Sequence, residues 1–239
     1  MNILRFDSEK SWLSGVATFW RDRLHVQPRL RQCLASGNTP IPVYGELVRA
    51  VQQKQVSLRQ ATVFALDEFG GLAPDDAGKC RNMLLRDLVG HVDLPPNNFH
   101  CFDADAPDLD AECAAFDRRV GPGFDLVILG IGLNGHLGMN EPGSSIDSPT
   151  RRVDLAETTI SSSAKYLTHA NLPRWGLTVG MKQFFASKEV WLVATGAAKA
   201  EIVRRVVQGE ITEDVPASLM RRHANCSLFV DAAAGSLLG

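Results

Sequence analysis

The sequence predicts an α/β protein of three layers, in which helices cover both faces of a mostly parallel β-sheet. Short apolar runs rich in Val, Ile, Leu and Phe recur along the chain and are typical of buried strands; the clearest is FDLVIL, over residues 124–129. Segments with apolar residues at helical spacing separate these runs. Because strands that alternate with helices form βαβ units, their strands are parallel. No internal repeat or low-complexity linker interrupts the sequence, so we expect a single domain over residues 1–239.

The first predicted elements are a helix, a strand and a second helix. Residues 8–25 carry apolar side chains at helical spacing, and Ser8 is a suitable N-cap. Residues 30–35 form a weaker apolar run that ends in SGNTP, which predicts a strand followed by a turn. A helix over residues 42–53 follows, because Pro42 suits the first turn of a helix.

The middle of the chain contains two strands of buried character. ATVFAL, over residues 61–66, is short, apolar and β-branched, and it ends abruptly in DEFGG. Helical spacing then predicts helices over residues 79–90 and 109–120. FDLVIL follows the second of them as the clearest strand.

The last part of the chain repeats the alternation. GLTVG (176–180) and EVWLVA (189–194) are predicted strands. The second leads through a Thr-Gly pair into a helix over residues 197–207, and CSLFVD (226–231) is the final strand.

The composition excludes several classes of function. An apolar fraction of 45% and a net charge of −2, with Lys and Arg scattered along the chain, argue against nucleic acid as a partner. No run approaches the roughly 18 apolar residues that span a bilayer, and the first residues lack the apolar segment of a signal peptide. The absence of CxxC pairs favours a reducing cytoplasm and buried thiols over disulfides or zinc. The cysteines are Cys33, Cys80, Cys101, Cys113 and Cys226.

Ligands of parallel α/β sheets bind beyond the carboxyl ends of the strands, where SGNTP, DEFGG, GIGLNGHLGMNEPG and TGAAK are predicted to lie. Ser36, Gly37, Asn38 and Thr39 are small and precede a helix, so their backbone N–H groups suit a phosphate, although an ordinary turn has the same residues. Lys199 stands in the first turn of a helix, where a cation opposes the helix dipole. A bound phosphate would explain its position, and a solvated lysine is the alternative.

Two strand-end loops carry candidate catalytic residues. A carboxylate at Asp67, delivered by a strand to the edge of the sheet, can act as a general base; a solvated turn is the alternative. His136 has Asn134 and Glu141 close in sequence, so its ring can be held in one tautomer and serve as acid and base near neutral pH. Asp67, His136 and Glu141 also have the donor atoms of a metal site, but no HxH or HExxH spacing supports a metal.

The glycines Gly130, Gly132 and Gly135 spell GxGxxG, the spacing of a dinucleotide site. Such a site requires a helix that opens at the third glycine. Gly138 and Pro142 follow instead and prevent a helix there. We therefore expect no nicotinamide or flavin cofactor.

Four motifs occur in the same order over nearly the whole chain as in a known family: the SGNTP loop, LDEFGGL, GIGLNGHLGMNEPGSS and the LTVG to TGAAKA segment. Together they resemble the glucosamine-6-phosphate deaminase and isomerase family. The resemblance implies a three-layer α/β/α fold like that of ribose-5-phosphate isomerases and CoA transferases. It also implies a cofactor-free reaction: ring opening of a 2-amino-2-deoxyhexose 6-phosphate, proton transfer from C2 to C1, and hydrolysis of the imine to a ketose 6-phosphate and ammonia.

The resemblance also implies a role for each candidate residue. Asp67 matches the enolising base, and His136, assisted by Glu141, matches the group that opens the sugar ring. No metal or cofactor is implied. The expected substrate contacts are Ser36, Gly37, Asn38, Thr39, Gly135 and Lys199.

The sequence departs from the family pattern at two positions. Asn134 stands where glucosamine-6-phosphate deaminases usually carry Asp; an amide oxygen can accept a hydrogen bond and orient the His136 ring, but it cannot stabilise an imidazolium as an anion does. Asn134 and PASLMRRHAN (216–225) resemble a galactosamine-6-phosphate branch, so both epimers are candidate substrates. Val153 stands where allosteric members carry a basic residue, two positions after Arg151, and we expect little or no activation by an N-acetylated sugar phosphate.

Two alternatives to this enzyme remain. The related 6-phosphogluconolactonases share the GxGxxGH loop, but they typically continue with an A-S-L-F-P-like sequence where this chain has NEPGSS. A sugar-phosphate-binding sensor that has lost the chemistry is the other alternative, suggested by Asn134. We expect a cytoplasmic enzyme whose partner is a small amino sugar phosphate, and the sequence is compatible with a homo-oligomer.

Overall fold

The centre of the protein is a seven-stranded sheet in which all pairs of neighbouring strands run parallel. The computed structural model describes residues 1–168 and 171–239. The strand order is β1-β10-β9-β6-β2-β3-β5. The parallel sheet predicted from the alternating pattern is confirmed. Its strands are β1 (Asn2–Phe6), β2 (Arg31–Leu34), β3 (Thr62–Ala65), β5 (Phe99–His100), β6 (Leu126–Gly130), β9 (Val190–Ala194) and β10 (Cys226–Asp231).

Helices cover both faces of this sheet and complete the three layers. One face packs against α1 (Glu9–Val26), α2 (Ile41–Gln52) and α3 (Cys80–Asp87). The other packs against α4 (Leu109–Val120), α6 (Met181–Ala186), α7 (Ala200–Gln208) and α8 (Pro216–Leu219). Successive residues of a strand point to opposite faces, so each buried strand supplies apolar side chains to both cores. In β6, for example, Val127 belongs to one core and Ile128 to the other.

The longest helix begins where the sequence predicts. The Ser8 hydroxyl accepts a hydrogen bond from the Ser11 N–H at 3.2 Å, so the expected N-cap is confirmed. Trp12 and Trp20 are fully buried against the sheet. Their indole N–H groups donate to the Phe229 carbonyl at 3.1 Å and to Gln32 Oε1 at 2.7 Å, so the burial of these rings leaves no indole donor unsatisfied.

A second, antiparallel sheet of three strands lies beside the first. It has the order β4-β8-β7, with β4 (Asp67–Phe69), β8 (Trp175–Thr178) and β7 (Arg151–Asp154). The GLTVG strand therefore exists but does not belong to the parallel sheet, because its partners are the DEF segment and β7. Helix α5 (Glu157–Ser163) shares a small apolar core with this sheet.

The patterns did not predict β1, β4, β5, β7 or the short helices α5, α6 and α8. These elements are short, and β1, β5 and β7 are half-buried or exposed along much of their length. The helix expected to begin at residue 197 begins at Ala200, after a 3-10 turn over Ala197–Lys199. The other 3-10 helices cover Val89–His91, Pro96–Asn98, Ala164–Tyr166 and Met220–Arg222.

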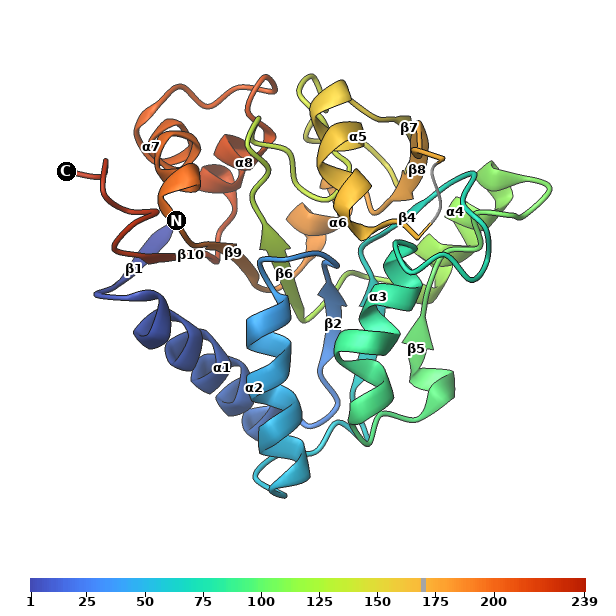
Figure 1. Cartoon of the computed structure of the whole chain (residues 1–239), viewed down its shortest axis with the longest axis horizontal. Coiled ribbons are helices and arrows are strands. Elements are labelled where there is room, and N and C mark those ends of the chain that lie inside the picture. Colours follow the sequence, from blue (N-terminus) through green and yellow to red (C-terminus); the bar gives the residue numbers. More distant parts are fainter. Residues whose placement is uncertain (169–170) are drawn as a thin grey trace.

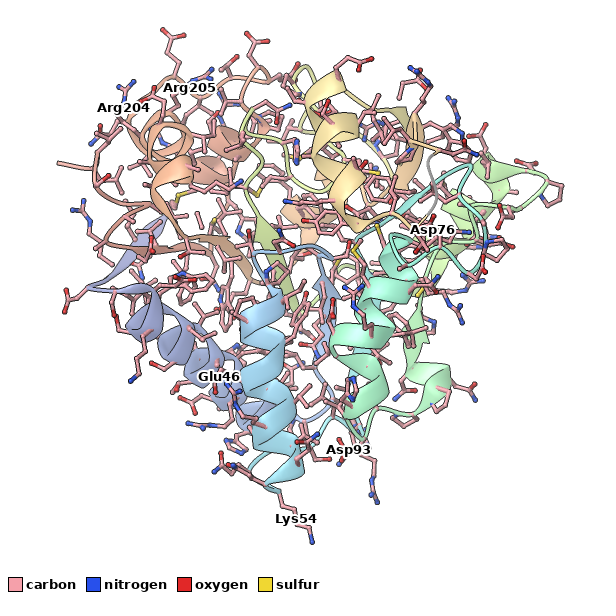
Figure 2. All side chains as sticks on the ribbon, in the orientation of Figure 1. Glu46, Lys54, Asp76, Asp93, Arg204 and Arg205 are labelled. Atoms are coloured by element: carbon pink, nitrogen blue, oxygen red, sulfur yellow. The ribbon has the colours of Figure 1, made fainter. Side chains whose placement is uncertain are left out.

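The carboxyl ends of β2, β3, β6 and β9 meet at one edge of the sheet. Figure 1 shows β2 and β6 pointing toward the end of the molecule that holds α5, β7 and β8. Lys54 and Asp93 lie at the opposite end (Figure 2). After β2 the chain adds β3 and β5 on one side, and it then returns to add β6 and β9 on the other. This reversal between β2 and β6 creates the crevice in which α/β proteins bind ligands.

All five cysteines are unpaired. Cys33, Cys80, Cys113 and Cys226 are buried as expected, but Cys101 is partly exposed next to the edge strand β5, so the expectation of burial was wrong for that residue. Within residues 1–168 and 171–239, no helix is long and apolar enough to cross a membrane.

Candidate active site

The crevice at the carboxyl edge brings together the four loops that the sequence singled out. The charge of His136, in the loop after β6, acts on the carboxylate of Asp67, at the start of β4. Lys199 Nζ donates to the Ile131 carbonyl at 2.6 Å, which joins the loop after β9 to the loop after β6. A Cβ atom at Gly130 would lie 3.9 Å from Cβ of Thr39, so the loop after β2 also borders β6.

The ring of His136 lies directly against Gly132. A Cβ atom at Gly132 would be 2.4 Å from the imidazole, closer than any side chain permits. The Gly132 N–H also donates to the His136 carbonyl at 3.0 Å, which closes a tight turn. No helix follows the glycines, since the next one, α5, begins at Glu157. The GxGxxG spacing therefore makes room for a histidine ring and does not cap a helix.

Glu141 holds the other side of the histidine. Its Oε2 atom lies 3.5 Å from Nδ1 of His136. Burial alone would raise the pKa of Glu141, but hydrogen bonds from His136, Thr159 and Asn134 outweigh it and lower that pKa to about 2. The carboxylate is therefore ionised at any pH near neutrality, and it can stabilise a positive charge that develops on the imidazole.

Asn134 and Thr159 both bind this carboxylate. Asn134 Nδ2 donates to Glu141 Oε2 at 2.9 Å, while its Oδ1 accepts the backbone N–H of His136 at 3.2 Å. The amide thus fixes Glu141 and the loop. Its oxygen accepts the backbone N–H of His136, so the expectation that it orients the ring directly was wrong. The Thr159 hydroxyl donates to Glu141 Oε1 and lies 3.4 Å from His136 Nδ1. Sequence reasoning missed Thr159, because nothing distinguishes it from the other hydroxyl residues of α5.

Asp67 begins β4, where it pairs with Thr178 of β8. The residue is 8% exposed. Burial raises the pKa of Asp67 to about 6, although a hydrogen bond from Cys80 and the charge of His136 oppose the shift. A carboxylate with a pKa just below neutrality is ionised at pH 7 and still accepts a proton readily, which suits a general base.

Glu68, the neighbouring acid, has a different task. Its carboxylate accepts the backbone N–H groups of Phe69 and Cys80 at 2.9 Å and of Arg81 at 3.0 Å. Burial nevertheless raises its pKa to about 7. Glu68 therefore fastens the start of α3 to β4.

The SGNTP loop connects β2 to α2. Gly37 has a φ of +104°, a conformation that side chains disfavour, and the Asn38 N–H donates to the Tyr166 hydroxyl at 3.1 Å. Helix α2 then begins without a side-chain N-cap, so its first N–H groups lack that partner. Small residues, a turn and an uncapped helix start are the features of an anion cradle.

Two lysines approach the same region. Burial lowers the pKa of Lys199, and the positive charge of Lys165 lowers it further, so the two cations repel each other in this structure. An anion between them would relieve that repulsion. Lys165 lies in the 3-10 turn after α5 and was not predicted, since one basic residue in a hydroxyl-rich segment carries no sequence signal.

Gly135 lies at the back of the histidine loop. It has a φ of +88°, and a Cβ atom there would be 2.7 Å from Val215. Its carbonyl accepts the Ala217 N–H at 2.9 Å and its own N–H donates to the Gly132 carbonyl. The PASLMRRHAN segment thus supports the loop from behind, and the expected contact between Gly135 and a substrate stays a prediction.

A separate pocket of about 650 Å³ lies between α3 and β5. Its lining includes Glu68, Lys79, Arg81 and Phe102, but not Asp67 or His136.

In the part of the chain that the structure describes, no group of His, Cys, Asp and Glu side chains is arranged to hold a metal ion.

Comparison with known proteins agrees with this architecture. The model of a family described as glucosamine-6-phosphate isomerases/6-phosphogluconolactonase matches residues 9–229. The chain therefore belongs to this family, as its motifs predicted. It is 35% identical to a glucosamine-6-phosphate deaminase of Bacillus pumilus over 240 residues, which cover 99% of this chain and 100% of the relative. It is 39% identical to a glucosamine-6-phosphate deaminase 2 of Giardia intestinalis over 208 residues, 85% of this chain and 79% of the relative.

Solved structures share this fold. A structure described as a monomeric glucosamine-6-phosphate deaminase matches with a TM-score of 0.95 and 33% identity, covering 99% of this chain and 100% of that one. A 6-phosphogluconolactonase from Trypanosoma brucei matches with a TM-score of 0.78 and 20% identity, covering 100% and 98%. The second likeness is one of fold alone.

Proposed function

We propose that the protein is a cofactor-free deaminase and isomerase of hexosamine 6-phosphates, with glucosamine 6-phosphate as its main substrate. The observation that carries the proposal is the pairing of two groups across one crevice: a buried base, Asp67, and a histidine, His136, backed by the ionised Glu141. An aldose-to-ketose conversion needs one group of each kind. The curated relatives support the gluco epimer over the galacto epimer that Asn134 suggested.

The phosphate would bind first and orient the sugar. The backbone N–H groups of the Ser36–Thr39 loop and the ammonium groups of Lys165 and Lys199 supply the donors and the positive charge. Each charge-assisted hydrogen bond contributes about 1.5–3 kcal/mol. Because the phosphate is remote from C1 and C2, this binding energy holds the reacting carbons in place between Asp67 and His136.

His136 would then open the ring. The imidazole accepts the proton of the C1 hydroxyl and returns a proton to the ring oxygen, so the C1–O5 bond breaks and an aldehyde forms. During this transfer the ring carries a positive charge. The ionised carboxylate of Glu141, 3.5 Å from Nδ1, stabilises that charge, and Thr159 and Asn134 hold the carboxylate in place.

Asp67 would move the proton between carbons. Its carboxylate takes the C2 proton while O1 gains a proton from the substrate's own ammonium group, which leaves an enolamine. The resulting carboxylic acid then delivers its proton to C1. Carbon 2 is then an iminium, and water adds to it and expels ammonia. The sum is substrate plus water to ketose 6-phosphate plus ammonia. Asp67 ends as the carboxylate with which it began, and the reduction of carbon 1 balances the oxidation of carbon 2, which is why no redox cofactor is required.

One assay tests this proposal against both alternatives. Purified protein is incubated in turn with glucosamine 6-phosphate, galactosamine 6-phosphate and 6-phosphogluconolactone, and ammonia, ketose 6-phosphate and acid release are measured. We expect ammonia and ketose in equal amounts from glucosamine 6-phosphate, and none from Asp67→Asn. Sugar-phosphate binding without ammonia from either epimer would support the sensor, and rapid lactone hydrolysis would support the lactonase.

We also propose a cytoplasmic location. The five unpaired thiols and the phosphorylated substrate support this proposal.

A further inference from the structure

We propose that Arg151 and Asn140 are positioning residues for the reaction. Together they hold the turn between His136 and Glu141 at a fixed place relative to the base, Asp67. This inference rests on the proposed function for the roles of the three residues that are held. We assign neither Arg151 nor Asn140 a contact with the substrate or with the reacting atoms.

Asn140 closes the turn that separates His136 from Glu141, and it is fully buried. Its backbone N–H donates to the Leu137 carbonyl at 3.0 Å. Its side chain reinforces this closure, because Nδ2 donates to the same carbonyl at 2.9 Å. Leu137 directly follows His136, and Asn140 directly precedes Glu141. The closed turn therefore brings the imidazole and the carboxylate together, with Oε2 of Glu141 3.5 Å from Nδ1 of His136.

The same amide group joins this turn to the strand that carries the base. An amide nitrogen has two hydrogens to donate, and Nδ2 of Asn140 also donates to the Val179 carbonyl at 2.9 Å. The N–H of Val179 in turn donates to the Leu66 carbonyl at 2.9 Å. Because Leu66 directly precedes Asp67, Val179 connects the histidine turn to the backbone beside the base.

Arg151 fixes the orientation of the Asn140 amide. Its Nη1 atom donates to Asn140 Oδ1 at 2.9 Å and to the Pro149 carbonyl at 3.2 Å, and its Nη2 atom donates to the Ser144 hydroxyl at 3.0 Å. A guanidinium only donates, so the amide oxygen must face it and Nδ2 must face the two carbonyls. Every polar atom of the buried Asn140 side chain therefore has a partner.

The three-stranded sheet places Arg151 in line with the base. Asp67 of β4 and Arg151 of β7 both pair with Thr178 of β8, so the side chains of these three residues lie on one face of the sheet. The Thr178 hydroxyl accepts the N–H of Met139, inside the histidine turn, at 3.2 Å. One edge strand of this sheet thus carries the base, and the other carries the arginine that holds the turn.

The test compares Arg151→Met and Arg151→Lys with the wild-type enzyme in steady-state kinetics with glucosamine 6-phosphate. Methionine removes every donor of the guanidinium, so kcat should fall roughly 10- to 100-fold. Lysine keeps the charge but lacks the planar fork, so it loses one of the contacts with Asn140 and Ser144, and kcat should fall by a smaller factor. KM should change little in either variant, because Arg151 is not among the expected phosphate contacts.

Arg152→Met is the matched control. Arg152 is the next residue of β7, it is exposed, and the alternation of a strand directs its side chain to the opposite face. There it pairs with Asp154 at 3.1 Å and lies over the Trp175 ring. Its substitution should leave kcat and KM unchanged.

A second measurement does not depend on turnover. Hydrogen exchange of the backbone N–H groups over residues 132–145 should be faster in Arg151→Met than in the wild type and Arg152→Met, while exchange in the seven-stranded sheet stays the same. This result supports the proposal even if no hexosamine phosphate is converted, which would refute the proposed function alone. Unchanged exchange over residues 132–145, or an unchanged kcat in an active enzyme, overturns the proposal. If Arg151→Met does not fold, Arg151→Lys decides by the same two measurements.

Discussion

Replacing Glu141 by glutamine tests the part of the mechanism that depends most on geometry. The substitution keeps the size of the side chain and removes its charge, 3.5 Å from Nδ1 of His136. It also places an amide where three donors now converge, from Thr159, Asn134 and the Ala156 N–H. The pKa of Glu141 is about 2, so the wild-type side chain carries its full charge across the working pH range. The variant therefore lacks that charge at every pH assayed.

The expected loss follows from the interaction removed. A hydrogen bond to a charged group contributes about 1.5–3 kcal/mol, and if the imidazolium exists only during ring opening, the whole amount is lost from the transition state. This corresponds to a decrease in kcat of roughly 10- to 100-fold. KM should change little, because Glu141 is not among the expected phosphate contacts.

The assay measures ammonia release with ordinary and C2-deuterated substrate. When ring opening becomes slower than the cleavage of the C2–H bond, it limits kcat. The isotope effect on kcat in Glu141→Gln should therefore fall toward one. Thermal unfolding of the variant serves as the control for misfolding. An unchanged kcat, or an isotope effect that grows, would refute the assignment of Glu141 to ring opening.

The remaining predictions concern other parts of the crevice. Asp67→Asn should abolish turnover but preserve sugar-phosphate binding. Because burial raises the pKa of Asp67 from 3.8 to about 6, the ionised carboxylate destabilises the wild-type fold above pH 6, and the substitution should therefore stabilise the fold there by up to about 3 kcal/mol. This gain should vanish below about pH 4, which urea unfolding at several pH values can measure. Lys199→Met should raise KM about 10-fold or more with a smaller effect on kcat, whereas the remote control Lys54→Met should change neither (Figure 2). Gly132→Ala should displace the His136 ring, which a Cβ would approach to 2.4 Å, and greatly reduce kcat without loss of phosphate binding. With Val153 in place of a basic residue, rate curves should be hyperbolic with or without an N-acetylated sugar phosphate, and a sigmoidal curve relieved by it would contradict this.

The predictable part of the fold is the buried part. Strands β2, β3, β6, β9 and β10 are covered on both faces, so their sequences are continuous apolar runs that are visible without a structure. The strands β1 and β7 are short and partly exposed, and β4 has only three residues. Their existence depends on pairing partners that are distant in sequence, and no local pattern reports such a partner.

The same division applies to the site. The sequence by itself determined that SGNTP, DEFGG, the histidine loop and TGAAK share one edge, because the carboxyl ends of parallel strands must meet there. It also identified the candidate base, Asp67, and the candidate pair of His136 with Glu141. Only the tertiary structure decided that Thr159 binds Glu141 and that Lys165 approaches Lys199. These side chains come from helical segments whose sequence patterns indicate only helix formation and packing. They acquire a role in the site only because the fold places them against strand ends that are distant in sequence.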